Sequence, residues 1–441
     1  MIMINKTRGI CISIFTVALL LRIGLNVVKT ELFFREPFFL SGDAYSKSIN
    51  SDSVWYDAAA RAFIQGKGIV SIEENIYRRN FYREFTQPAW LLIKKIAPGY
   101  YAHKLIPPLY PIFLSLCYLL FGMNTLSYFI PQAIVGSLTC VVIYFLAEEL
   151  FDKKTAILAG FATALYPDLI LWTYFIRVET LFIFLLSLSF LFLAKAGRTK
   201  SVFMVSAGAI IFGLACLTRI TAILFIPILF LWQLYNFNWN KKSGFKVSLA
   251  ATLLTLLVLT PWCARNYIVF GEFTPFTDEV NVAIIGVRAD AYRVPGSNAY
   301  YGRDADRFTD SEAYYRSHKS SIVGVLMYVK DHLKENSLSY VKNFMTFLGP
   351  CTVHMKNSAK IYKTLVWIII FPLAFWGMVV SLKSKPGSGL LILFIIYYAL
   401  LHSLAGVDTG LVYRYPIQPF LCIFAAYGAL ELYKRRKGWI I

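Results

Sequence analysis

One aspartate stands where charged side chains are rare. Asp52 follows the first long apolar run of the chain, in the segment SDSVWYDAAARAFIQGKG. A charged carboxylate held close to a bilayer is costly, so its presence there suggests a function. A carboxylate can take the proton of a hydroxyl group that attacks an electrophilic carbon, provided that it lies within hydrogen-bond reach. Asp52 is therefore the first candidate for a general base.

The residues after Asp52 form the pattern D-x3-Y-x3-A-x2-F-x2-G-x-G, whose fixed positions are Asp52, Tyr56, Ala60, Phe63, Gly66 and Gly68. Tyr56 is a candidate substrate contact within this pattern. The alternative is that Asp52 only caps a helix, because SDS before an amphipathic segment is a common start signal. Two other carboxylates of the region, Asp43 and Asp57, do not fit the register.

The elements that must position these residues are membrane helices. Hydrophobic residues make up 57% of the chain and charged residues 16%, and apolar runs of roughly 20 residues recur along it. We predict an all-α polytopic membrane protein without a separate soluble domain. A net charge of +19 would suggest nucleic acid as the partner of a soluble protein. Here, Lys and Arg can be assigned to loops on one side of a bilayer.

The apolar runs predict about ten transmembrane helices, over residues 9–28, 126–149, 155–173, 178–195, 201–217, 220–235, 246–263, 362–382, 388–405 and 413–432. Lys6 and Arg8 precede the first span and place the N-terminus in the cytoplasm. This span is expected to be an uncleaved anchor, because it carries Arg22 and continues into VVKTELFF.

The segment 106–122, IPPLYPIFLSLCYLLFG, is apolar enough to cross the membrane. The basic loops around Lys154, Lys200, Lys242 and Lys383 and the terminal LYKRRKG all become cytoplasmic only if it does not cross. We therefore predict an outward-facing interfacial or re-entrant helix. Both termini are then cytoplasmic, in the plasma (inner) membrane, with the active site on the outer face.

This topology divides the chain into three parts. Residues 1–265 form a catalytic transmembrane module that includes a first outward loop at about 29–108, with interfacial helices. Residues 266–361 form a second outward region, in which VGVLMYVKDHLKENSLSYVKNFMTFLGP is predicted to be an amphipathic helix on the outer leaflet. Residues 362–441 supply the C-terminal spans. The seven cysteines lack metal-ligand spacing, although Cys263 and Cys351 could meet outside the membrane.

Several further fragments occur in an order that resembles one known family. They are HKLIPPLYPIFLSLCYLLFG, AEELFDKKTAILAGFATALYPDLILW, FIRVETLF, GLACLTRITAILFIP, LTPWCARNYIVFGEFTPF and VYRYPIQPFLCIFAAYG. Together with the Asp52 loop, they are similar to the mannosyltransferase-like GT-C glycosyltransferases, a family that includes protein O-mannosyltransferases and the lipid A aminoarabinose transferase. The resemblance implies a GT-C-like fold and an inverting transfer of one sugar from a polyprenyl-phosphate donor to a hydroxyl acceptor, with Asp52 as the base. The acceptor would be a glycan, a lipid or a protein.

The resemblance also suggests roles for residues at the outward ends of spans. Glu179, in RVETLF, matches a second acidic position, where it would orient a substrate or ligate a divalent metal together with Asp52. Its alternative roles are to cap its own helix or to pair with Arg177. A departing lipid phosphate needs positive charge, and the candidates for binding it or the substrate are Arg414 and Tyr415 in VYRYP, Arg265 in PWCARN, and His103 and Lys104 before IPPLYP. Snorkelling to lipid headgroups is the alternative for the cations, and Arg22 and Arg219 are interpreted as structural.

Two absences favour a lipid-linked donor. The sequence has no Gly-rich phosphate loop and no soluble nucleotide-binding domain in which to place one. Its D-x-D at Asp304 and Asp306 lies in a polar run interpreted as a solvated loop. An O-antigen polymerase or ligase is an alternative enzyme, but those lack an acidic loop directly after the first span. A flippase for lipid-linked sugars is the other alternative, and it would have broken helices and ionisable residues at mid-membrane.

Overall fold

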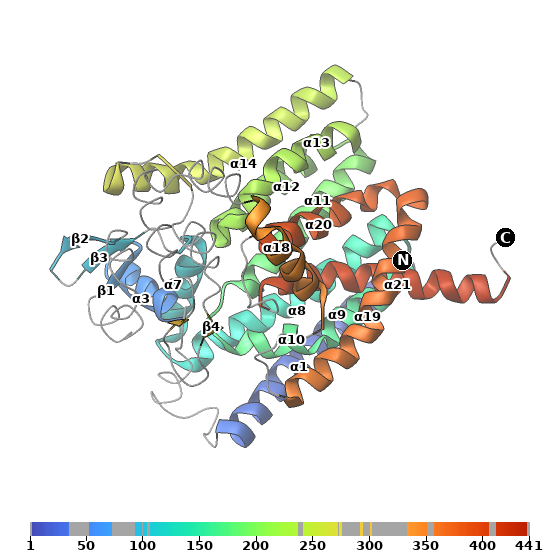
Figure 1. The fold of residues 1–441 in the computed structure, drawn as a ribbon, viewed down its shortest axis with the longest axis horizontal. Coiled ribbons are helices and arrows are strands. Elements are labelled where there is room, and N and C mark those ends of the chain that lie inside the picture. Colours follow the sequence, from blue (N-terminus) through green and yellow to red (C-terminus); the bar gives the residue numbers. More distant parts are fainter. Residues whose placement is uncertain are drawn as a thin grey trace.

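The computed structural model describes residues 2–34, 53–72, 93–98, 100–103, 106–236, 241–271, 273–275, 292–293, 300–301, 333–350, 357–404 and 412–438. Within these ranges the chain is almost entirely helical, as predicted, and the helices lie side by side in one bundle (Figure 1). Asp52, Asp43, Lys104, Cys351 and the D-x-D at Asp304 and Asp306 lie outside the described residues.

Five of the described helices contain a stretch long and apolar enough to cross a membrane: α1 (Ile2–Phe34), α8 (Thr125–Leu150), α11 (Glu179–Thr199), α14 (Lys241–Phe270) and α19 (Asn357–Ser384). A sixth candidate is a broken span, in which α9 (Lys153–Leu165) is followed at a 55° bend by α10 (Pro167–Leu171) and η1 (Trp172–Tyr174). The remaining predicted spans overlap α12 (Val202–Thr218), η2 (Ile220–Phe225) with α13 (Ile226–Asn236), α20 (Gly389–Leu404), and η4 (Val412–Ile417) with α21 (Gln418–Arg436). The chain is thus a multi-pass membrane protein, and the count of ten spans stays a prediction.

Local sequence signals set several helix starts. Asp152 accepts a hydrogen bond from the backbone of Thr155 at 2.9 Å and begins α9 two residues after α8 ends. Such a short connection forces the two helices to run antiparallel, and they pack along each other. Asn124 and Ser127 form a reciprocal capping box at the start of α8. The sequence thus places the turns between neighbouring helices through ordinary capping chemistry.

The first outward region contains α3 (Ser53–Ile64), in line with the start signal at SDS, and also a small antiparallel sheet. Its strands are β1 (Val70–Ile72), β2 (Ile93–Ala97) and β3 (Tyr100–His103), in the order β1-β3-β2. Two further short strands, β4 (Tyr292–Arg293) and β5 (Tyr300–Tyr301), pair in the second outward region. These strands were not predicted from the sequence, because strands of two to five residues give too short an alternation to stand out.

The segment 106–122 forms α7 (Leu109–Phe121), a helix of 13 residues. At 1.5 Å per residue it is about 20 Å long, which is shorter than the roughly 30 Å hydrocarbon core of a bilayer. It packs against α3, and the Ser115 hydroxyl donates to the backbone carbonyl of Ala60 at 3.1 Å. The length and this packing are compatible with the predicted non-crossing helix.

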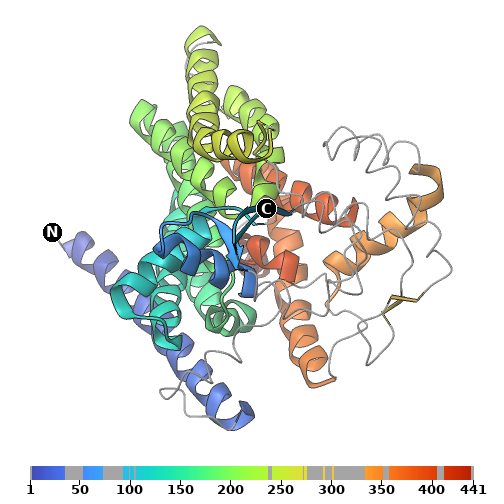
Figure 2. The same ribbon diagram turned by 90° about the vertical axis from the view of Figure 1, so that its left-hand side faces the viewer.

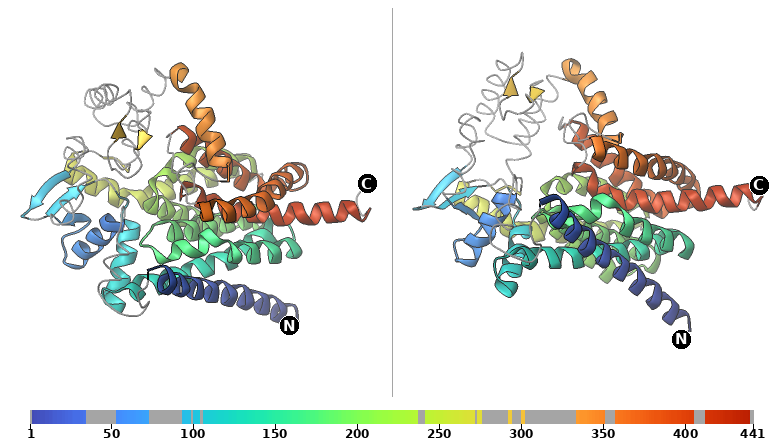
Figure 3. Two further views of the ribbon diagram at one scale, coloured as in Figure 1. Left: turned by 60° about the horizontal axis from the view of Figure 1, so that its bottom comes forward. Right: turned by 90° about the horizontal axis from the view of Figure 1, so that it is seen from below.

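The sheet and the termini lie at opposite ends of the molecule. Figure 3 shows β1–β3 at one end of the bundle and both labelled termini at the other. Figure 2 looks from the sheet end and shows α14 and α18 (Leu333–Leu348) at the edge of the bundle. Of the amphipathic segment predicted before Pro350, residues 333–348 are described and helical. The arrangement agrees with both termini being on the same side of the membrane.

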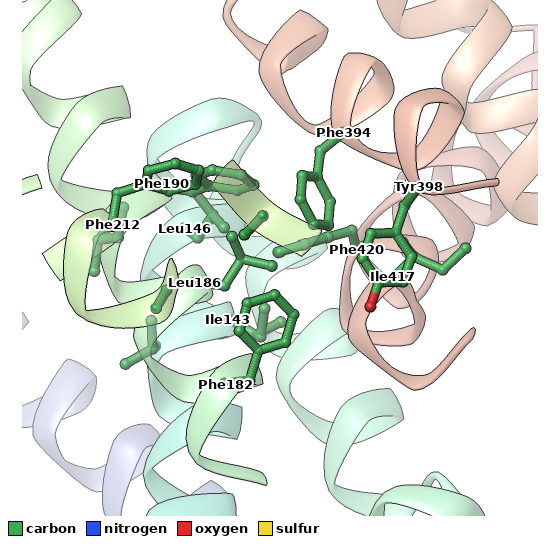
Figure 4. Close-up of a cluster of buried hydrophobic side chains, with 14 of the residues drawn as sticks. Ile143, Leu146, Phe182, Leu186, Phe190, Phe212, Phe394, Tyr398, Ile417 and Phe420 are labelled. Carbon is green, nitrogen blue, oxygen red and sulfur yellow. The ribbon is translucent and has the colours of Figure 1, made fainter. Parts of the chain in front are cut away.

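Aromatic side chains fill the centre of the bundle. Phe190 of α11 lies 5.4 Å from Phe394 of α20 and 5.5 Å from Phe420 of α21, measured between ring centroids. Figure 4 shows this cluster with side chains from α8, α11, α12, α20 and α21 converging. Since lipid is as apolar as these rings, close packing rather than expulsion from water holds such helices together.

The C-terminal helices meet through glycine. A Cβ atom on Gly377 of α19 would overlap the backbone carbonyl of Phe424, and one on Gly428 of α21 would overlap the carbonyl of Leu373. The two backbones therefore touch where they cross, as small residues allow in membrane helix pairs. α21 also packs against α9, which joins the C-terminal helices to the N-terminal bundle.

Candidate functional site

The described residue nearest to Asp52 in the predicted pattern is Tyr56. Its side chain is buried and meets Tyr110 of α7 edge to face, with ring centroids 5.0 Å apart. The Tyr110 hydroxyl donates to Oε1 of Gln132 at 2.8 Å. Burial raises the pKa of Tyr110 well above its usual value, so this hydroxyl remains a donor. These contacts fix the start of α3 against α7 and α8.

Asp57, the rival carboxylate, has a different environment. It is buried, accepts a hydrogen bond from the Tyr118 hydroxyl at 2.7 Å, and forms an ion pair with Nε of Arg61 at 2.8 Å. Both partners belong to the contact between α3 and α7. Asp57 therefore stabilises the first outward region, in agreement with its place outside the Asp52 pattern.

Glu179 is the first residue of α11 and is buried. Its Oε1 pairs with Arg219, just after α12, at 3.1 Å rather than with the neighbouring Arg177, which lies 5.3 Å from the Trp172 ring. Among the described residues, its Oε2 has no hydrogen-bond partner. The position at a helix N-terminus also favours a negative charge. Glu179 thus combines one paired oxygen with one that can accept a further hydrogen bond.

Tyrosines surround this ion pair. The guanidinium of Arg219 lies 5.0 Å from the centroid of the Tyr413 ring, and it interacts electrostatically with the hydroxyls of Tyr398 and Tyr56. Tyr56 belongs to the first outward region, whereas Tyr398 and Tyr413 come from the C-terminal helices. The pair therefore lies where the first loop, the central helices and the C-terminal helices meet.

A second charged cluster lies beside the first. Asp168 of α10 forms an ion pair with Lys363 of α19 at 3.0 Å and accepts a hydrogen bond from the Tyr362 hydroxyl at 3.1 Å. Arg414 and Tyr166 line the same small hollow as these residues. The hollow holds two cations and one carboxylate, so its side chains carry a net positive charge.

Tyr415 lies between the two clusters. Its buried ring is 5.1 Å from the Trp172 ring and 5.8 Å from Nζ of Lys363, and it lines a cavity together with Glu179. The structure thus brings Glu179, Arg414, Tyr415 and Tyr56 into one region. Four of the residues singled out from the sequence converge there.

Arg414 also makes hydrogen bonds that stabilise the fold. It donates hydrogen bonds from one nitrogen to the carbonyl of Phe347 at 3.1 Å and to that of Gly349. These carbonyls end α18, so Arg414 anchors that helix to η4. The guanidinium is buried and is not placed as a freely snorkelling side chain would be.

The other predicted cations differ from Arg414. Arg265 donates a hydrogen bond to the backbone carbonyl of Ile69 at 2.9 Å. Its guanidinium carbon lies 4.8 Å from the centroid of the Trp262 ring. The backbone of His103 pairs with Ile93 at the end of β3. Since Lys104 lies outside the described residues, the substrate roles of His103, Lys104 and Arg265 stay predictions.

The comparisons with known proteins bear on this arrangement. Residues 106–264 match the family described as dolichyl-phosphate-mannose-protein mannosyltransferase. Over 216 residues the chain is 24% identical to "Putative mannosyltransferase YkcB" of Bacillus subtilis (strain 168), covering 49% of this chain and 28% of that protein. The oligosaccharyltransferase AglB from Archaeoglobus fulgidus, solved with an inhibitory peptide and a dolichol-phosphate, superposes on 98% of this chain and 52% of its own, with a TM-score of 0.54 and 13% identity. The chain has the GT-C fold.

The GT-C fold confirms the resemblance drawn from the sequence fragments. ArnT from Cupriavidus metallidurans, solved with undecaprenyl phosphate, is also similar over 88% of this chain and 76% of its own, at 14% identity, but its TM-score is 0.39. The chain spans only about a quarter of the length of YkcB and half that of AglB. The comparisons therefore give the fold and a family match to one segment of this chain.

Within this GT-C fold, a metal site remains a prediction. Among the described residues, no group of three His, Cys, Asp or Glu side chains is close enough to hold a metal ion. One oxygen of Glu179 already has Arg219 as its partner, and Asp52, its predicted co-ligand, is not described. The described side chains do not form a metal-binding set, and the reaction proposed below uses no metal ion.

Sequence reasoning missed three residues of this region. Arg219 was interpreted as structural, and neither Asp168 nor Lys363 was singled out. Asp168 stands in the fragment YPDLILW, which contributed to the family resemblance, and an acidic residue inside the predicted span 155–173 was the available signal. Lys363 lies 195 residues from Asp168, and nothing in a single sequence links two such positions.

Proposed function

We propose that this protein is an inverting membrane glycosyltransferase, which moves one sugar from a polyprenyl-phosphate donor to a hydroxyl acceptor at the outer face of the plasma membrane. The GT-C fold and the family match over residues 106–264 support the class of reaction. The observation that carries the proposal is the ion pair of Glu179 with Arg219, whose electrostatic surroundings include Tyr56 of α3. Asp52 immediately precedes α3, so two regions singled out separately from the sequence meet at one place.

In the proposed reaction the acceptor oxygen attacks the anomeric carbon of the donor sugar. The carbon–oxygen bond to the phosphate breaks, and the phosphate departs with the bonding electrons. The carboxylate of Asp52 takes the acceptor proton as the new bond forms. Attack from the side opposite the phosphate inverts the anomeric configuration.

Departure of the phosphate needs cations rather than a general acid. Arg414 and Lys363 line one hollow, and among the described residues Asp168 is its only acidic lining residue. A guanidinium can hold two phosphate oxygens at once, whereas an ammonium acts as a point charge. We assign the donor phosphate to these two cations, with Tyr415 between it and the sugar. The hollow has no space open to the centre of a water molecule, so its side chains must move apart for the phosphate to enter.

Glu179 is assigned to a sugar hydroxyl. Its Oε2 has no hydrogen-bond partner among the described residues, and the ion pair with Arg219 holds the carboxylate in place. A charged acceptor makes a stronger hydrogen bond to a hydroxyl than a neutral one does. Glu179 would therefore orient the sugar against the attacking oxygen.

The competing assignment is a flippase for lipid-linked sugars, and one observation favours it. The span formed by α9, α10 and η1 is broken by a 55° bend, as transporter helices often are. The two activities leave different products. A flippase moves the intact lipid-linked sugar, whereas a transferase releases free polyprenyl phosphate.

The test uses membranes from cells that lack the gene, supplemented with the purified protein and a radiolabelled polyprenyl-phosphate sugar. A panel of sugars begins with mannose, because the matched family is named for it. We expect label to leave the donor lipid and free polyprenyl phosphate to appear. Translocation of intact donor without either product would contradict the proposal.

A further inference from the structure

A small cavity lies behind Glu179, on the side of α1. Its lining includes Arg22 of α1, Thr139 of α8, Glu179 of α11 and Tyr415 of η4. The space open to the centres of water molecules is about 20 Å³. Since one water molecule needs about 10–15 Å³ by this measure, the cavity has room for roughly one or two.

In the part of the chain that the structure describes, two charged side chains line this cavity with an atom that has no hydrogen-bond partner. Arg22 is 2% exposed, and its Nε has no acceptor there. Its other nitrogens reach neutral groups, the carbonyl of Ala18 at 3.1 Å and the sulfur of Cys140 at 3.8 Å. Glu179 is 4% exposed, and its Oε2 is the second such atom. A buried donor and a buried acceptor of opposite charge are each costly to leave unsatisfied.

We propose that the cavity holds ordered water that links Nε–H of Arg22 to Oε2 of Glu179. The water accepts a hydrogen bond from the guanidinium and donates one to the carboxylate. The hydroxyl of Thr139 donates to the carbonyl of Val135, so its oxygen can accept the second hydrogen of the water. This gives the water the two to four polar partners that buried waters have.

Through this water, Arg22 becomes a positioning residue for Glu179. Arg219 holds one oxygen of the carboxylate directly, and Arg22 holds the other through water, so the carboxyl plane is fixed from both sides. Each carboxylate oxygen has two acceptor lone pairs, so Oε2 can accept hydrogen bonds from both the water and a sugar hydroxyl. The role in catalysis rests on the proposed function of Glu179, but the water itself does not.

Gly136 of α8 is part of the same arrangement. A Cβ atom at this position would lie 2.7 Å from Nε of Arg22. Any side chain here must push the guanidinium away from its place beside the cavity. Gly136→Ala is therefore a way to disturb the link without altering either charged residue. Gly208→Ala is the matched control, because its Cβ would lie 2.8 Å from Leu193 in a contact that does not involve the cavity.

The first test does not depend on activity. Thermal unfolding in detergent is measured for Arg22→Met, Glu179→Gln and the double variant. We expect the unfolding temperature of the double variant to be well above the value obtained by adding the two single-variant decreases. Arg22→Met with Glu149→Gln is the control and should be additive, because Glu149 lies nine residues beyond Cys140 on α8, about 13 Å along the helix. A density map of the wild type that resolves ordered water should show a peak within hydrogen-bond distance of both atoms. Additive unfolding of Arg22→Met with Glu179→Gln, or an empty cavity, would overturn the proposal.

The second test measures transfer. Gly136→Ala should lower kcat by about tenfold or more while the KM for the donor changes little, because the sugar contact is misplaced but the phosphate hollow is intact. Arg22→Lys should restore more turnover than Arg22→Met, and Gly208→Ala should retain it. Equal kcat for the two glycine variants would refute the positioning role. If the wild type transfers no sugar, the proposed function fails, and the unfolding cycle and the density still decide on the water.

Discussion

At the scale of single residues, the central feature is the buried ion pair of Glu179 with Arg219, in which Oε2 of Glu179 has no partner among the described residues. Arg219→Met should leave Glu179 without the partner of its ion pair and lower the free energy of unfolding by about 3–5 kcal/mol. Glu179→Gln should destabilise the protein in the same way by leaving Arg219 unpaired. Adding Arg219→Met to Glu179→Gln should restore much of this stability in a thermal unfolding assay, because neither member of the ion pair then remains buried without its direct partner.

The same double variant separates structure from chemistry. If the pair serves the reaction, sugar transfer stays lost although stability returns. Recovery of transfer together with stability would mean that Glu179 and Arg219 only hold the bundle together.

Arg414 has two tasks that variants can separate. Arg414→Ala should raise the KM for the donor about tenfold or more, and Arg414→Lys should rescue transfer only in part, because an ammonium cannot hold two phosphate oxygens. Arg414→Ala also removes the hydrogen bonds that anchor α18. Trp367→Phe is the control, because Nε1 of Trp367 donates to the carbonyl of Leu348 at 2.6 Å and anchors the same helix end without a cation. An equal loss of transfer in Trp367→Phe would leave Arg414 as an anchor only.

At the scale of elements, the sequence predicted the helices far better than their contacts. Helical spans show up as apolar runs, and capping residues such as Asp152 mark where helices begin. The pairing of Glu179 with Arg219 could not be read in this way, because Arg177 is closer in sequence and only packing decides which guanidinium reaches the carboxylate. The sheet β1-β3-β2 was also missed, since β1 pairs with residues about thirty positions away, and β2 and β3, although close in sequence, are too short to show a clear alternation.

The crossing of α19 and α21 gives the clearest prediction about an element. Gly428→Ala should force the two backbones apart and destabilise the protein by about 1–3 kcal/mol or more. Gly24→Ala is the control in a membrane helix, because a Cβ there would meet nothing within 4 Å. It should be neutral or slightly stabilising. Equal unfolding temperatures for the two variants would contradict the close crossing.

At the scale of the whole molecule, the prediction is the topology. A reporter fused after Lys154 or at the C-terminus should register as cytoplasmic, and one near Ser297 as external. The shortness of α7 and the common side of the two termini in Figure 3 support this orientation. If α7 crosses the membrane, the reporters downstream of it will be reversed.

The proposed mechanism depends on Asp52, which is identified by the sequence pattern alone. The most direct measurement is the transfer of label from a polyprenyl-phosphate sugar by Asp52→Asn, with Asp152→Asn as the control. Asp152 is an N-cap in the structure, and Asn is an equally good capping residue, so the control should retain full transfer. We predict that Asp52→Asn is expressed normally and transfers no sugar, because the amide keeps the size and the capping ability of aspartate but cannot take the acceptor proton. Near-normal turnover by Asp52→Asn would show that Asp52 is a cap like Asp152 and would contradict the proposed mechanism.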